Sequence, residues 1–98
     1  MLEDFIAAQP GDPFPRYGLA MEHKNAGNLS AARETFAELV AKFPDYVATY
    51  LMYGNTLAEL GASSEAVAAL QAGLEIANKV GDSHTAGELS AALTELQG

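Results

Sequence analysis

The chain has 98 residues, of which 49% are hydrophobic, and this length predicts one domain, residues 1–98, with a single core. Thirteen acidic against five basic residues give a formal net charge of -8, which argues against nucleic acid and anionic membranes as partners. The absence of cysteine excludes disulfides and cysteine-bound zinc, and no apolar run approaches the roughly 20 residues of a membrane span. Acidic residues stand near the start, where a signal peptide would carry bases, so we expect a cytoplasmic protein.

The first expected element is a short N-terminal helix over about residues 2–9. Leu2, Phe5 and Ile6 have the three- and four-residue spacing of one helical face. Pro10 ends this helix, because proline cannot continue it and disfavours helical geometry in the preceding residue.

Two longer helices are predicted next. Asp12 can cap the first, and Pro13 suits its first position because an amide hydrogen there has no partner within the helix. Gly27 can supply a turn with positive φ, and a second helix with an apolar stripe then runs to Pro44. These two helices form a predicted hairpin, repeat 1, over about residues 13–46.

A second hairpin, repeat 2, is predicted over about residues 47–80 with its turn at Gly61. Its return helix is expected over about residues 63–79. Asn78 stands where repeat 1 has Pro44, so this helix is expected to run about a turn longer than its counterpart.

The last expected element is a helix over about residues 83–97. Thr85 and Glu88 have the spacing of a capping box at its start. Its apolar stripe consists of Ala86, Leu89, Leu93 and Leu96. No further helix follows as a partner, so this helix is expected to cap the array.

A 34-residue period relates the two hairpins. Arg16-x2-Leu19-Ala20-x2-His23…Ala32-x3-Phe36…Pro44 is followed by Tyr50-x2-Tyr53-Gly54-x2-Leu57…Ala66-x3-Leu70…Asn78. The pattern resembles the tetratricopeptide repeat, W-x2-L-G-x2-Y…A-x3-F…P, in which each repeat is a helix-turn-helix unit. The resemblance implies an all-α fold: an α-α superhelix of two such repeats, with a short N-terminal helix and a C-terminal capping helix. Repeat 1 departs from the signature at Arg16 and His23, where the family usually has Trp and Tyr.

Small residues fall where the two helices of each hairpin would touch. We expect Ala20 to meet Ala32 and Gly54 to meet Ala66, because larger side chains would separate helix axes beyond the roughly 8–10 Å of close packing. Larger apolar residues between the hairpins are expected to form one continuous core.

In the family that the chain resembles, the first helix of each repeat lines a concave groove. The resemblance implies that this groove is lined by Phe14, Tyr17, Met21, Lys24, Leu51 and Asn55. Apolar anchors with a few polar groups suit capture of a peptide or partner protein, so we expect a protein–protein interaction scaffold without a cofactor. Two alternatives stay open: the N-terminal helix covers the patch, or the chain forms a homodimer through the repeat ends or the same patch. Clamping of an acidic peptide tail is disfavoured, because Lys24 is the one matching base in an acidic chain.

No catalytic or metal-binding residue is predicted. His23 and His84 are far apart in the sequence, and metal or acid–base use would need a third partner. The sequence has neither a G-x-S-x-G motif nor a glycine-rich phosphate loop, so an enzyme is not expected. The spread acidic residues are interpreted as a solvated outer face; they are Glu34, Glu38, Glu59, Glu65, Glu75 and Glu95.

Overall fold

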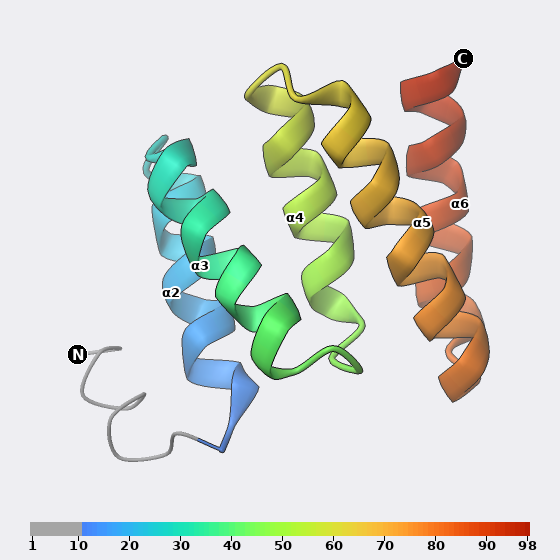
Figure 1. The fold of residues 1–98 in the computed structure, drawn as a ribbon, viewed down its shortest axis with the longest axis horizontal. Helices are drawn as coiled ribbons and strands as arrows, with labels where there is room; N and C mark the ends of the chain where they lie inside the picture. The colour runs from blue at the N-terminus through green and yellow to red at the C-terminus, as the bar shows by residue number, and fades with distance from the viewer. Residues whose placement is uncertain (1–10) are drawn as a thin grey trace.

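The computed structural model describes residues 11–98, and within that range the chain forms five α-helices and no strand (Figure 1). The helices are α2 (Pro13–Asn25), α3 (Leu29–Lys42), α4 (Ala48–Glu59), α5 (Ser63–Val80) and α6 (Ser83–Gln97). Each helix packs against the next, so α2 and α3 form one hairpin and α4 and α5 a second, with α6 closing the row. Helix α4 also contacts both α2 and α6. The all-α prediction is confirmed, whereas the helix expected over residues 2–9 lies outside the described residues.

Aspartate side chains cap the N-termini of two helices. Asp12 Oδ1 accepts the backbone N–H of Phe14 at 3.0 Å, as predicted for the start of α2. At the start of α6, Asp82 accepts the backbone N–H of Thr85 at 3.0 Å and the Thr85 hydroxyl at 2.7 Å. These hydrogen bonds lower the pKa of Asp82. The predicted capping box of Thr85 and Glu88 is wrong, because α6 begins at Ser83 and Thr85 donates to the cap.

The turns after α2, α4 and α5 depend on glycine. Gly27 and Gly61 both have φ of 81°, and Gly81 has φ of 79°, a backbone region that side chains with a Cβ rarely enter. Gly27 and Gly61 were expected from the sequence. Helix α5 continues to Val80 and has 18 residues against 14 in α3, which confirms the longer return helix.

Close helix packing in the two hairpins uses different residues. Ala20 and Ala32 are both fully buried in one cluster, as expected. In the second hairpin, a Cβ on Gly54 would lie 2.5 Å from Leu70 Cδ2. A side chain at position 54 would therefore have to displace the buried end of Leu70, while Ala66, the predicted partner of Gly54, is also fully buried.

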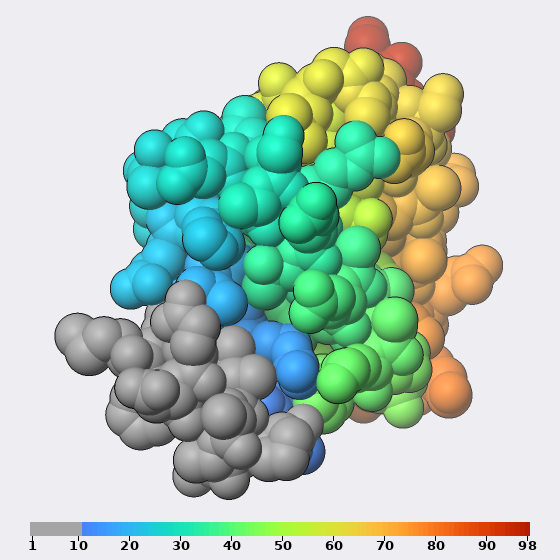
Figure 2. Space-filling model, turned by 60° about the vertical axis from the view of Figure 1, so that its left-hand side comes forward, coloured from blue at the N-terminus to red at the C-terminus, as the bar shows by residue number. Residues whose placement is uncertain are grey.

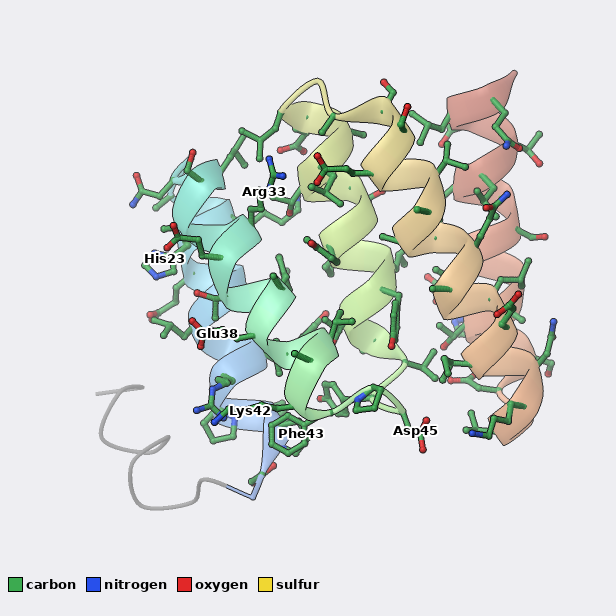
Figure 3. All side chains as sticks on the ribbon, viewed as in Figure 1. His23, Arg33, Glu38, Lys42, Phe43 and Asp45 are labelled. Carbon is green, nitrogen blue, oxygen red and sulfur yellow. The ribbon has the colours of Figure 1, made fainter. Side chains whose placement is uncertain are left out.

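The apolar interior is connected along the row of helices. Three clusters of buried residues are bridged by partly buried side chains: Tyr53 packs against two of the clusters, and Leu96 also packs against two. On the exposed side of α3 and α5, Arg33 Nη2 lies 2.6 Å from Glu65 Oε2 and pairs these two helices (Figure 3). Figure 2 shows α3 exposed along its outer side. Within residues 11–98, no helix combines the length and apolar character needed to cross a membrane.

Candidate functional site

A pocket of about 210 Å³ opens between α4 and α6, with α5 behind it. It is lined by Gly54, Asn55, Ala58, Leu70, Ala92, Glu95 and Leu96. The space exists because three facing positions carry glycine or alanine, while the nearly buried Leu70 closes the base. The Asn55 amide and the Glu95 carboxylate are the polar groups of an otherwise apolar lining.

Lys24 and Asn55 occupy different environments. Lys24 Nζ lies 3.4 Å from Glu59 Oε1, so this pair joins α2 to α4, and the Lys24 side chain is 18% exposed. Of the predicted groove residues, Asn55 is the one that lines the pocket. Its amide can both donate and accept hydrogen bonds, whereas the ammonium of Lys24 already faces a carboxylate.

Tyr17 and Met21 are half-buried against the cluster that contains Phe36. The Tyr17 ring meets the rings of Phe36 and Tyr46 edge-on, with centroids 6.2 and 5.8 Å apart. Burial raises the pKa of Tyr17, and the neighbouring Tyr46 and Glu88 raise it further. Helix α4 contacts both α2 and α6, so these three helices form one side of the molecule.

Leu51 and Phe14 differ sharply in exposure. Leu51 is half-buried and packs against the cluster that contains Val47 and Tyr50. Phe14, in the first turn of α2, is 67% exposed. The predicted groove residues therefore have four different environments. Tyr17, Met21 and Leu51 pack against buried clusters, Lys24 is ion-paired, Phe14 is exposed and Asn55 lines the pocket.

Helix α6 contributes pocket residues that the sequence interpretation missed. Ala92, Glu95 and Leu96 line the pocket, although α6 was expected to act as a cap. A third step of the 34-residue period could have found one of them, because it carries Ala58 of α4 onto Ala92 of α6.

The six acidic residues expected on a solvated outer face are all exposed, but they do not share one face. Glu95 lines the pocket, and Glu59 pairs with Lys24 of α2. The expectation is therefore wrong for these two carboxylates. It failed because the spacing of acids along the chain does not tell which side of each helix meets a neighbour.

The two histidines lie apart on the surface. His23 points away from the helices on α2 (Figure 3), and His84 Nε2 lies 3.5 Å from Glu88 Oε1 at the start of α6. In the part of the chain that the structure describes, no three side chains of metal-binding type come together.

The chain is similar to known repeat proteins in sequence and in fold. A family model described as tetratricopeptide repeat matches residues 25–93. A tetratricopeptide repeat domain protein from Salinibacter ruber is 38% identical with a TM-score of 0.84; the match covers 89% of this chain and 88% of the solution structure or 98% of the crystal structure. A Bordetella parapertussis protein studied in solution is 25% identical, with a TM-score of 0.83 and coverage of 98% of this chain and 84% of that protein. Among curated proteins, none matches. The chain therefore belongs to the tetratricopeptide repeat family, whose members generally mediate protein–protein interactions and typically act as non-enzymatic scaffolds.

Proposed function

We propose that this chain is an interaction module that binds a peptide, or a segment of a partner protein, on the side formed by α2, α4 and α6. The observation that carries the proposal is the pocket between α4 and α6, where the Asn55 amide stands beside small apolar side chains. An amide can hydrogen-bond both the N–H and the C=O of a peptide backbone, and the apolar space can take a side chain.

Phe14 supports the same proposal from α2. This residue is 67% exposed and so is available for contact, and aromatic side chains are enriched in protein interfaces. Tyr17, Met21 and Leu51 are half-buried in the proposed surface and form its walls. Lys24 of α2 pairs with Glu59 of α4 beside that surface.

The decisive experiment compares capture by the wild type with capture by a double variant, Phe14→Ala with Asn55→Ala. Both residues lie outside the buried clusters, so we expect thermal unfolding to stay near that of the wild type. Immobilised protein exposed to native cell extract should retain proteins that the double variant loses, as measured by quantitative mass spectrometry. Glu34→Ala with Glu75→Ala, on the exposed faces of α3 and α5, is the matched control and should retain them.

Equal retention by the double variant would contradict the proposed surface. Sedimentation of the wild type across a range of concentrations tests the homodimer alternative. A constant dimer that the double variant dissociates would mean that a second copy of the chain, and not a different protein, occupies the surface.

A further inference from the structure

The charges around the α4–α6 pocket are unbalanced. Glu95 lines the pocket, and Glu88 lies seven residues earlier on the same helix, which places the two carboxylates about 10 Å apart along α6. Within residues 11–98, Glu88 pairs with His84 and Glu95 makes no ion pair. The side of α6 that faces the pocket therefore presents negative charge.

The basic residues of the chain do not offset this charge. Arg16, Lys24 and Arg33 lie against Glu38, Glu59 and Glu65, respectively. Lys42 and Lys79 lie in the last turns of α3 and α5. None of these five side chains lines the pocket, and they are all the lysines and arginines that the chain has.

The pocket has room for one apolar side chain. Its volume of about 210 Å³ far exceeds the roughly 10–15 Å³ that a single water needs on such a measure, so a leucine, isoleucine or methionine side chain can enter it. Ala58 and Ala92 leave this room, and Asn55 offers hydrogen bonds at its edge.

We propose that the partner segment carries an apolar side chain that enters the α4–α6 pocket, with lysine or arginine about one helical turn to either side to meet Glu88 and Glu95. This inference rests on the proposed function and names the chemistry of its ligand. A purely apolar segment would leave the carboxylates without a counter-charge, and an acidic segment would be repelled by them. A second copy of this chain is disfavoured as the occupant, because each copy has a formal net charge of -8.

Fluorescence anisotropy with three labelled helical peptides tests the inference. The probe has an alanine background, one central leucine and a lysine one turn to either side; the controls replace both lysines with glutamate, or the leucine with serine. We expect saturable binding of the probe, at least tenfold weaker binding of the serine control, and no saturable binding of the glutamate control. Raising the salt concentration should weaken binding of the probe.

Protein variants locate the site. Glu95→Gln should weaken probe binding about two- to fivefold, whereas Glu75→Gln, the same change of charge on the exposed side of α5, should leave it unchanged. Ala92→Leu fills the pocket and should weaken binding at least tenfold. If Ala92→Leu fails to fold, the leucine-to-serine change in the peptide measures the same contact without altering the protein.

The inference is overturned by equal or better binding of the glutamate control, by equal effects of Glu95→Gln and Glu75→Gln, or by absence of probe binding. Proteins that are captured from extract and lost with Phe14→Ala and Asn55→Ala would then preserve the proposed function while refuting a basic partner. If the basic probe does not bind and the double variant retains the same proteins as the wild type, both proposals are refuted.

Discussion

The two hairpins share one repeat spacing but differ in the size of a buried residue on the returning helix. At one repeat position, α3 carries Leu39, which is fully buried, whereas α5 carries Gly73. At another, both leading helices carry a large side chain: the side chain of Arg16 in α2 is 13% exposed and Tyr50 of α4 is buried. The two hairpins therefore differ on the returning helix, where the first carries a large side chain and the second carries glycine.

Contacts around Gly73 explain this difference. A Cβ at this position would collide with Cβ of Tyr50 and would lie 3.2 Å from Leu89 Cδ2. Tyr50 of α4 and Leu89 of α6 therefore occupy the volume that a side chain on α5 would need. The comparison teaches that a repeat position fixes the total volume to be filled, while neighbouring helices decide which residue fills it.

Alanine at position 39 of α3 and at position 73 of α5 tests the comparison. We expect the larger loss of stability in the first hairpin. Leu39→Ala removes a fully buried side chain that packs with Ala20, Ala32 and Phe36, and leaves a cavity. We expect a loss of about 2–5 kcal/mol in the free energy of unfolding, measured by urea denaturation followed by circular dichroism. A loss below about 1 kcal/mol would show that the hairpin collapses around the missing side chain, and that the position does not fix a volume.

The same alanine in the second hairpin should destabilise the protein by overpacking. Gly73→Ala places a methyl group against the stem of Tyr50, which cannot swing away as the end of a flexible side chain could. We expect a loss of about 1–3 kcal/mol, reduced by the better helix propensity of alanine. The measurement is again urea denaturation.

Gly87→Ala is the matched control for this variant. Gly87 is exposed in the middle of α6, and no atom lies within 4 Å of its potential Cβ. We expect a gain of about 0.5–1 kcal/mol from helix propensity alone. If Gly73→Ala and Gly87→Ala both stabilise the protein, Tyr50 does not hold the volume beside α5.

The features that sequence predicted are those that depend on local geometry. Helical spacing of apolar residues, aspartate followed by proline, and glycine at Gly27 and Gly61 each act within a few neighbouring residues. The all-α fold and the longer α5 followed from such signals. Ala20 and Ala32 were also placed correctly, because the family signature marks both positions.

The features that sequence missed depend on distances between helices. Gly73 falls outside the family signature, and its role appears once Tyr50 and Leu89 are seen beside it. The pocket required Asn55 of α4 to face Glu95 of α6, which no spacing along the chain specifies. Of the groove residues inferred from the family, Asn55 lines this pocket, and the inference left out the contribution of α6.

The smallest expected effect concerns the hydroxyl of Tyr50, the large residue of the second hairpin. Its Oη donates a hydrogen bond to the carbonyl oxygen of Pro44 at 2.6 Å and so ties α4 to the α3–α4 connection. Tyr50→Phe keeps the ring beside Gly73 and removes this bond alone. We expect a loss of about 0.5–1.5 kcal/mol near neutral pH, at the lower end because exposed Pro44 can turn its carbonyl oxygen to water.

Alkaline titration sharpens this last prediction. Burial, and next the charge of Asp45, raise the pKa of Tyr50 above its ordinary value of about 10. The folded state therefore holds the phenol proton more tightly than the unfolded chain, so this stabilisation is complete below about pH 10 and is lost as the pH rises through the folded pKa. Stability of the wild type should fall over that range more steeply than stability of Tyr50→Phe, in urea denaturation repeated at several pH values. Tyr17 and Tyr46, whose pKa values are also raised by burial, should leave a residual slope in the variant. Equal slopes in the two proteins would mean that Tyr50 ionises as readily in the folded chain as in the unfolded one, and that its hydroxyl does not tie α4 to Pro44.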